Sequence, residues 1–284
     1  MTLDEVRKNI DEVDAEIKVL FKRRMELADE VARIKAESDD DIFKPDREIA
    51  ILEKQSSDVD DSIKLEYRAL LKRIMEVSRK YQYGRTLDLK NPRFLDYTEE
   101  NIQFKTAAAV KQELYIVDSI SKDSVITVDS FEELADTILS NKVDAGVAVM
   151  ENIGVDVSDG LHSILTNRDL YINKCSVIED GKYRKKVVTF SNKLIALPSH
   201  NRLKVMFVCR NRSGSLASIL SMISDYDVNL TEIHSKPYIK DEWNYVFMVE
   251  MTANLLNKKD RALVYQLMNE TDAFKVMGSY YCED

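Results

Sequence analysis

Two cations lie inside the apolar stripe of a predicted helix, where they would face a buried anion. On a wheel of about 100° per residue, one group of apolar side chains falls within about 40° of a common direction: Leu20, Leu27, Val31 and Ile34. Arg24 falls at about 40° and Lys35 at about 60° on the same wheel, within this stripe. Burying an unpaired charge costs several kcal/mol. We therefore expect the stripe to be buried and an anionic group to lie against Arg24 and Lys35.

Further polar residues lie at the margins of predicted helices. Arg7 is about 26 Å along the helix axis from Arg24, so the two reach one small ligand only if antiparallel copies of this helix meet. Four more polar residues lie at a helix margin or in a first turn: Arg47, Glu48, Ser78 and Gln82. From this pattern alone, the alternative is a charged coiled coil whose Arg and Lys stems lie along apolar surface.

Three predicted helices within residues 1–84 position this cluster. The first begins at a capping box formed by Thr2 and Glu5 and reaches about residue 37. It is about 50 Å long, so it either kinks or packs against a partner chain. Pro45 opens a short second helix. The third spans about residues 60 to 82, and Gly84 ends it.

Three further segments follow this all-α domain. Residues 85–103 are polar and irregular, which predicts a linker. Residues 104–198 predict an α/β segment, with helices at 130–141, capped by Ser130, and 160–167, and strands at 143–150, 170–178 and 185–197. Residues 199–284 have the β-α-β-β-α-β order of an α+β ferredoxin-like domain.

Composition excludes several classes of protein. The net charge of −9 argues against nucleic acid as a partner. No apolar run approaches the roughly 20 residues of a membrane span, and the N-terminus lacks a signal-peptide core. The three cysteines are widely separated, and no zinc-site spacing appears. Neither GxGxxG nor GxxxxGK[ST] occurs. We expect a reduced, cytoplasmic protein without a metal or cofactor.

The charged cluster resembles the all-α, AroQ-type chorismate mutase family of intertwined helical dimers. An N-terminal arginine, "RRMELADEVARIK", "PDREIAILEK" and "VSRKYQ" occur in that order over residues 3–83. Mapped residue by residue, the family's pocket falls on seven positions: Arg7 from the partner chain, Arg24, Lys35, Arg47, Glu48, Ser78 and Gln82. One departure is Lys44, four residues before Glu48, where a relative has Asp.

The resemblance implies that chorismate is the substrate. Its conversion to prephenate is a unimolecular [3,3] rearrangement, which requires an extended, flexible dianion to be held in a compact chair. The three arginines, with Ser78, are assigned to the two carboxylates, because guanidinium groups bind carboxylates bidentately. Lys35 and Gln82 are assigned to the ether oxygen and Glu48 to the ring hydroxyl. The predicted catalytic residues are Lys35, Gln82, Arg24 and Glu48.

Residues 199–284 resemble an ACT domain, an amino-acid-binding regulatory module. "RSGSLASIL" matches a GAL-type motif of phenylalanine-binding relatives, and "IHSKPYIKDEWNYVF" matches their ESRP segment, with His234 and Lys236 in place of Glu and Arg. The resemblance implies an allosteric site for phenylalanine, or else tyrosine, on eight residues: Gly214, Ser215, Leu216, Ala217, His234, Ser235, Lys236 and Pro237. A purely structural dimerisation module is the alternative.

A mutase domain followed by a C-terminal ACT domain resembles the bifunctional chorismate mutase/prephenate dehydratase family. The stretch "VDAGVAVMENIGVDVSDGLHSIL" resembles a strand, turn and helix of the dehydratase and retains Glu151 and Asn152. However, residues 104–198 are too few for the two-lobed dehydratase, and "KYRKKVVTF" stands where its catalytic Thr-Arg-Phe stretch belongs, with Arg184 in the threonine's place. We therefore interpret this segment as a degenerate, periplasmic-binding-like lobe without dehydratase activity.

The sequence thus predicts a multidomain chorismate mutase that forms a homodimer or larger homo-oligomer and is regulated by an aromatic amino acid. Two alternatives stay open. One is a bifunctional enzyme that still forms phenylpyruvate, and the other is a non-catalytic protein that senses amino acids.

Overall fold

The computed structural model describes residues 1–119, 125–238 and 244–283. The chain divides into two compact units, Met1–Arg93 and Phe94–Asp284. Among the described residues, no helix combines the length and the apolar character needed to cross a membrane.

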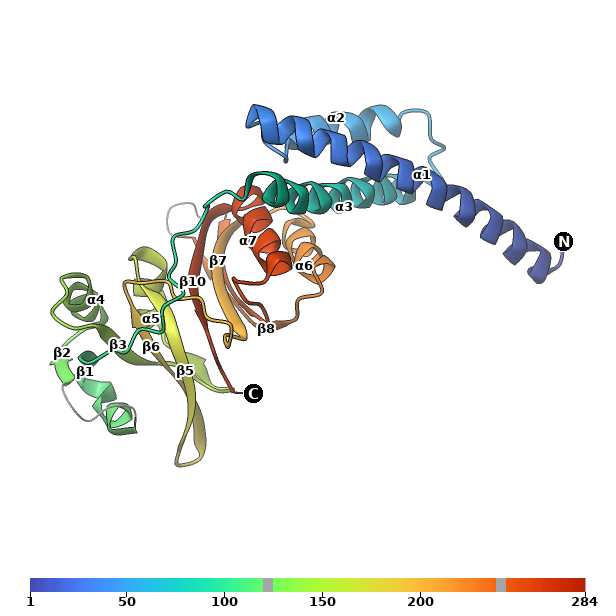
Figure 1. Cartoon of the computed structure of the whole chain (residues 1–284). Helices are drawn as coiled ribbons and strands as arrows, with labels where there is room; N and C mark the ends of the chain where they lie inside the picture. The colour runs from blue at the N-terminus through green and yellow to red at the C-terminus, as the bar shows by residue number, and fades with distance from the viewer. Residues whose placement is uncertain (120–124, 239–243, 284) are drawn as a thin grey trace. The chain divides into compact units, whose positions relative to one another are not determined.

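The first unit consists of three helices (Figure 1): α1 (Leu3–Ser38), α2 (Pro45–Gln55) and α3 (Lys64–Lys90). The predicted capping box is confirmed, because the Thr2 hydroxyl accepts a hydrogen bond from the Glu5 amide and the Glu5 carboxylate accepts one from the Thr2 amide at 2.7 Å. Pro45 opens α2 as predicted.

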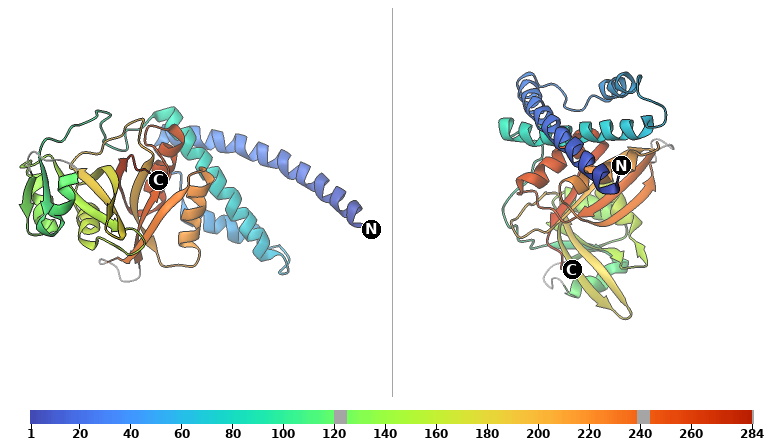
Figure 2. Two further views of the ribbon diagram at one scale, coloured as in Figure 1. Left: turned by 90° about the horizontal axis from the view of Figure 1, so that it is seen from below. Right: turned by 90° about the vertical axis from the view of Figure 1, so that its right-hand side faces the viewer.

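Helix α1 packs against α3 through small side chains rather than through the predicted apolar stripe. Its buried residues are Ala28, Ala32 and Ala36, spaced one turn apart on its C-terminal half. The prediction of a buried stripe is wrong for the single chain, since Leu20 is 65% exposed and Ile34 63% exposed. Figures 1 and 2 show the N-terminal half of α1 extending beyond α2 and α3. A long apolar surface therefore stays open on this helix.

Helix α3 continues past the predicted stop at Gly84 and takes up the first six residues of the predicted linker. A side chain added at Gly84 would meet no atom within 4 Å, so this glycine occupies an open helix face and is not a terminator. Ion pairs of Arg85 with Asp29 of α1, and of Lys90 with Asp39 at the C-cap of α1, hold the last two turns against that helix. The chain leaves the helix at Asn91, which adopts the left-handed conformation at φ 43°.

The second unit is built on one continuous sheet (Figure 1). Its first part contains β1 (Ala107–Val110), η1 (Lys111–Ser119), β2 (Val125–Val128), α4 (Phe131–Leu139), β3 (Ala145–Asn152), β4 (Asp156–Val157), α5 (Asp159–Asn167), β5 (Tyr171–Asp180) and β6 (Tyr183–Ser191). Its second part contains β7 (Arg202–Arg210), α6 (Ser215–Asp225), β8 (Leu230–Pro237), β9 (Asn244–Met251), α7 (Lys258–Glu270) and β10 (Asp272–Tyr280).

The strand order of this sheet is β2-β1-β3-β6-β5-β10-β7-β9-β8, with β4 paired to β3. The parts before and after residue 198 meet where β10 runs parallel to β5. At this junction Gly278 lies opposite Ile172, and a Cβ on Gly278 would come within 2.5 Å of the Ile172 carbonyl oxygen. The close approach of the two strands thus depends on the absence of a side chain there.

The predicted β-α-β-β-α-β order of residues 199–284 is confirmed, and its four strands follow the order β10-β7-β9-β8 with antiparallel pairing. The predicted helix with Ser130 as its N-cap is also confirmed, since the Ser130 hydroxyl accepts from the Glu133 amide at 3.1 Å. All three cysteines are free thiols.

Candidate active site

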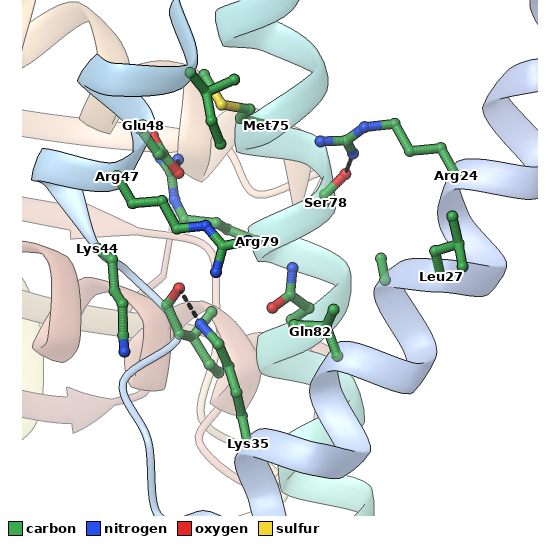
Figure 3. A pocket seen from close by; sticks show the side chains of 14 residues that line it. Arg24, Leu27, Lys35, Lys44, Arg47, Glu48, Met75, Ser78, Arg79 and Gln82 are labelled. Atoms are coloured by element: carbon green, nitrogen blue, oxygen red, sulfur yellow. Dashed lines mark hydrogen bonds and ion pairs between the residues drawn. The ribbon is translucent and has the colours of Figure 1, made fainter.

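A cavity of about 270 Å³ opens between the three helices of the first unit (Figure 3). Six of the seven predicted site residues line it, and helix α3 contributes two of them one turn apart. The lining residues are Arg24, Leu27, Ala28, Val31, Lys35, Ile42, Lys44, Arg47, Glu48, Ile51, Met75, Ser78, Arg79 and Gln82. Residues from three separate helices thus converge on one space, as Figure 3 shows for Arg47, Lys35 and Gln82.

Arg24 is held against α3 at one end of the cavity. Its Nη1 donates to the Ser78 hydroxyl and, at 3.3 Å, to the Ile74 carbonyl oxygen. Ser78 in turn donates to the same carbonyl at 2.8 Å. Burial lowers the pKa of the Arg24 guanidinium and the nearby Glu48 carboxylate opposes this shift, but arginine stays charged at neutral pH.

Lys35 anchors the loop that follows α1. Its Nζ donates to the carbonyl oxygens of Asp41 at 2.6 Å and Ile42 at 2.9 Å. Burial lowers the pKa of this half-buried amine, Lys44 and Arg47 act in the same direction, and the Asp40 carboxylate opposes them. An anion in the cavity would favour the protonated amine, because it would offset both the burial and the neighbouring cations.

The Glu48 carboxylate is paired with Arg79, a residue that the sequence analysis did not select. The Arg79 guanidinium donates to Glu48 and lies over the Phe43 ring, 4.6 Å from its centroid. The ion pair joins α2 to α3 between residues 31 positions apart in the sequence, so no helical spacing predicts it. Only the presence of a basic residue one turn before Tyr83, on a helix face that already carries Ser78 and Gln82, could have suggested it.

Two polar side chains that line the cavity, Gln82 and Arg47, have hydrogen-bonding groups that other described residues do not use. Gln82 is only 9% exposed, and its Oε1 finds no hydrogen-bond partner within the described part of the chain. Because an amide can present its oxygen or its nitrogen to a given point, Gln82 can either accept from a ligand or donate to it. Arg47, within the described residues, takes part in no hydrogen bond or ion pair.

The charge balance of the cavity favours an anionic ligand. Five cationic side chains line it, namely Arg24, Lys35, Lys44, Arg47 and Arg79, against the single carboxylate of Glu48. Arg79 is committed to that carboxylate and Lys44 to Asp40 at 2.6 Å. The remaining three cations match a small molecule with two carboxylates.

Arg7 lies outside this cavity. Its side chain is 67% exposed and its Nη1 lies 3.4 Å from an Asp4 carboxylate oxygen, on the part of α1 that extends beyond the other helices. The prediction that Arg7 acts in the pocket of a second copy is therefore not tested by the single chain and stays a prediction.

The residues predicted to bind an amino-acid effector fall on two elements of the second unit. Gly214 caps α6 in the left-handed conformation at φ 81°, and the following residues through Ala217 form the exposed or half-buried first turn of α6. On β8, the Lys236 ammonium pairs with Asp159. Among the described residues, no hydrogen bond or ion pair joins the 214–217 turn to residues 234–237, so this site stays a prediction.

The helical unit belongs to the class of all-α domains with a cationic pocket between helices. Residues 6–83 match the family model of chorismate mutase type II, so the chain carries a chorismate mutase type II domain. It is 29% identical over 80 residues to the bifunctional chorismate mutase/prephenate dehydratase of Aquifex aeolicus and 22% identical over 95 residues to that of Pseudomonas aeruginosa. These matches cover 28% and 34% of this chain, and 22% and 26% of the relatives' own lengths.

Solved structures show what fold the rest of the chain resembles. The prephenate dehydratase of Streptococcus mutans is similar with a TM-score of 0.51 at 14% identity, over 63% of this chain and 99% of that chain. GqqA, described as a novel type of quorum-quenching acylase, is similar with a TM-score of 0.55 at 14% identity, over 63% of this chain and 95% of its own. The prephenate dehydratase of Arthrobacter aurescens, solved in complex with L-Phe, has a TM-score of 0.52 at 13% identity, over 62% and 89% of the two chains. The chain thus has a prephenate-dehydratase-like fold as well as its mutase domain.

Proposed function

We propose that the helical unit is a chorismate mutase, converting chorismate to prephenate. The observation that carries the proposal is the convergence of Arg24, Lys35, Arg47, Ser78 and Gln82 on one cavity with a surplus of positive charge. The rearrangement breaks one C–O bond and forms one C–C bond within the same molecule, so it needs neither a proton transfer nor a co-reactant. What the protein must supply is confinement and electrostatic stabilisation.

The two ends of the cavity suit the two carboxylates of the substrate. Arg24 and Ser78, already in contact, present guanidinium and hydroxyl donors from α1 and α3. Arg47, on α2, presents a guanidinium that no protein group occupies within the described residues. Two guanidinium groups on different helices would hold the two carboxylates of chorismate at a fixed separation, which favours its compact conformer over the extended one.

Lys35 and Gln82 suit the ether oxygen, on which negative charge grows as the C–O bond breaks. Both side chains point into the space between the helices in Figure 3. In the free protein the Lys35 ammonium is held by two carbonyl oxygens, so its position is set before the substrate arrives. Such a preorganised donor lowers the barrier without reorganising during the reaction.

Glu48 suits the ring hydroxyl as a hydrogen-bond acceptor. The carboxylate is oriented by its ion pair with Arg79, which in turn lies over the Phe43 ring. We assign Arg79 the role of positioning Glu48, because its guanidinium is already committed to that carboxylate.

A homodimer would complete the pocket. The open apolar surface of α1 needs a partner to bury it, and Arg7 lies on the same extension of the helix. Two antiparallel copies of α1 would cover this surface and bring the Arg7 of each chain toward the pocket of the other.

Measurement of chorismate loss and of the product by chromatography, with the purified full chain, tests the proposal. We expect chorismate to disappear and prephenate to accumulate in equal amounts. Unchanged chorismate with folded, dimeric protein would refute it and favour the non-catalytic sensing protein.

We also propose that the second unit regulates rather than catalyses. The dehydratase-like fold is accompanied by "KYRKKVVTF" where the catalytic Thr-Arg-Phe stretch belongs, so we expect no phenylpyruvate from prephenate. An aromatic amino acid, phenylalanine first, is the proposed effector, supported by the L-Phe complex of the Arthrobacter aurescens protein. Thermal-shift and mutase assays with phenylalanine and tyrosine test the regulation, and phenylpyruvate formation from prephenate would show that the bifunctional alternative is correct.

A further inference from the structure

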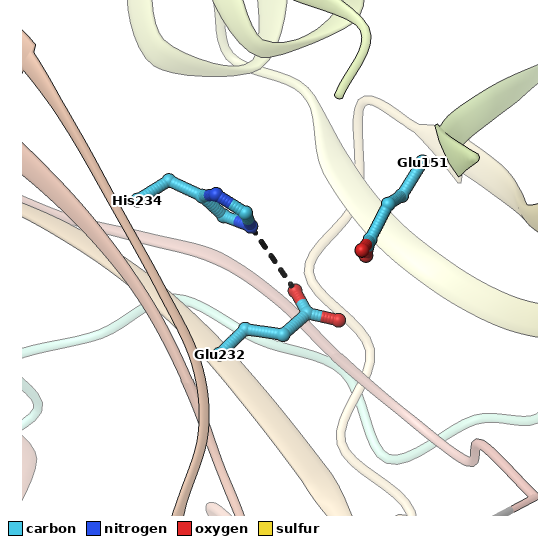
Figure 4. A group of neighbouring side chains, drawn as sticks. All are labelled: Glu151, Glu232 and His234. Carbon is cyan, nitrogen blue, oxygen red and sulfur yellow. Dashed lines mark ion pairs between the residues drawn. The ribbon is translucent and has the colours of Figure 1, made fainter. Parts of the chain in front are cut away.

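Three potential metal ligands meet between β3 and β8 of the second unit (Figure 4). Glu151 lies near the end of β3, and Glu232 and His234 lie on β8, two positions apart and therefore on the same face of that strand. One ligand atom from each residue lies within 4.8 Å of the other two. In Figure 4 the Glu232 carboxylate lies between the His234 imidazole and the Glu151 carboxylate.

The carboxylates of Glu232 and Glu151 differ in the cations that contact them. Glu232 accepts from Lys186 through one oxygen and from Lys204 at 2.8 Å through the other. Within the described residues, no Lys or Arg nitrogen lies within ion-pair distance of Glu151, whose carboxyl is hydrogen-bonded to that of Glu232. Burial and the Glu232 carboxylate raise the pKa of Glu151, and the more distant Lys186 and Lys204 oppose this shift. Two carboxylates in such proximity repel each other unless a proton or a metal ion lies between them.

The neighbouring imidazoles present unused nitrogen atoms. His234 Nε2 is buried without a hydrogen-bond partner and lies 3.9 Å from a Glu232 oxygen, beyond hydrogen-bond distance. His162, 1% exposed, lies beside it with 6.0 Å between ring centroids. The His162 Nδ1 lies 2.8 Å from the Ser158 carbonyl oxygen, to which it can only donate, so its Nε2 carries a lone pair, and this buried atom also finds no partner.

We propose that Glu151, Glu232 and His234 bind a divalent transition-metal ion of the Zn²⁺ type. Mixed carboxylate and imidazole donors suit zinc, whereas calcium and magnesium prefer oxygen donors throughout. Bonds of about 2.0–2.2 Å require the ligand atoms to approach to roughly 3.3 Å, so the Glu151 and His234 side chains must move toward the Glu232 carboxylate, which Lys186 and Lys204 hold in place.

Lys186 and Lys204 set a limit on the strength of this site. Both ammonium groups remain on Glu232 and repel a second cation, so the affinity should be lower than that of a closed structural zinc site. The ion would cross-link β3 to β8, which lie far apart in the strand order of the sheet. Binding should therefore raise the unfolding temperature of the second unit, independently of any mutase activity.

Titration of the chelator-treated full chain with Zn²⁺ and Co²⁺ tests the proposal. We expect one equivalent of Zn²⁺ to bind by calorimetry and to raise the unfolding temperature. Co²⁺ should give visible d–d bands without a near-ultraviolet thiolate band, because the free Cys175 and Cys282, whose sulfur atoms lie 3.1 Å apart, are not ligands.

Variants locate the ion. Glu151→Gln and His234→Gln should each weaken Zn²⁺ binding at least tenfold, whereas Glu113→Gln, a change at another half-buried carboxyl of the same unit, should leave it unchanged. Circular dichroism verifies that each variant is folded, and X-ray absorption of the wild-type zinc complex should show only nitrogen and oxygen neighbours. Absence of binding, binding that survives both substitutions, or a sulfur neighbour would each overturn the proposal.

Discussion

Replacing Lys35 by Met separates the two tasks of its ammonium group. Met keeps most of the aliphatic length of the side chain and removes the charge and the donors. In the free protein, the substitution deletes the hydrogen bonds to the carbonyl oxygens of Asp41 and Ile42. In the proposed reaction, it deletes the donor to the ether oxygen.

The two effects differ in size and in the measurement that reveals them. Charged donors contribute about 1.5–3 kcal/mol per hydrogen bond when buried, but Lys35 is half-buried and water replaces it on the two carbonyls, so we expect a loss of only about 1–2 kcal/mol in unfolding free energy. Removing one preorganised donor from a transition state costs about 3–4 kcal/mol, or roughly 10²–10³-fold in kcat.

The assay follows chorismate loss at saturating substrate, with urea unfolding of the same preparations. Lys44→Met is the matched control, since this lysine lines the same cavity but pairs with Asp40 at 2.6 Å, and we expect its kcat to stay within a few-fold of wild type. A Lys35→Met enzyme that keeps near wild-type kcat, or one that loses no more than Lys44→Met, would refute the assignment of Lys35 to the ether oxygen.

Three further predictions follow from the geometry. Burial lowers the pKa of Lys35, and the protonated amine is the proposed donor. We therefore expect kcat/KM to fall with rising pH at a lower pH than an ordinary lysine would give, and Lys35→Arg to move this fall to higher pH. Identical pH profiles of the two proteins would contradict the assignment. Mixing the inactive variants Arg7→Ala and Lys35→Met under subunit exchange should restore about a quarter of wild-type activity. Half of the randomly formed dimers are hybrids, and each hybrid has one intact site of two. Verified hybrids without activity would exclude a pocket shared between subunits. Gly84→Ala should stabilise the helical unit by about 0.5–1 kcal/mol in urea unfolding. Gly278→Ala should destabilise the second unit by about 1–3 kcal/mol, because its Cβ would clash with the backbone of Ile172. Equal changes in unfolding free energy would contradict an open site at Gly84 and a crowded one at Gly278.

The cavity could be predicted from sequence because its residues recur at helical spacing in a recognisable order. Ser78 and Gln82 lie one turn apart on α3, and Arg24 and Lys35 project from α1 toward them. Arg79 was not predicted because its partner, Glu48, lies on another helix, and an ion pair between distant segments produces no periodic pattern in the sequence.

Errors arose where burial depends on what packs against an element. The apolar stripe of α1 has the periodicity of a buried face, but in the single chain α1 meets α3 through alanines, which allow a closer approach than leucine or valine. Gly84 has the residue type of a helix stop and costs about 1 kcal/mol within a helix, yet the following turns continue α3 because they bury Thr86 and Leu87 and form ion pairs through Arg85 and Lys90. The pairing of β5 with β10 joins residues more than a hundred positions apart, which no local pattern encodes.

That pairing also sets an order of events during synthesis. Strand β10 is translated after every other strand of the described sheet, yet it lies between β5 and β7. A ribosome adding roughly 5–20 residues per second needs about 5–20 s to pass from the end of β5 to the end of β10. Until then, the edge of β5 that β10 will occupy is unpaired, and so is the corresponding edge of β7 once β7 has been synthesised. Unpaired strand edges are where nascent chains associate wrongly. The exposure of these two edges ends only when Asp272–Tyr280 has left the ribosome and pairs with both strands.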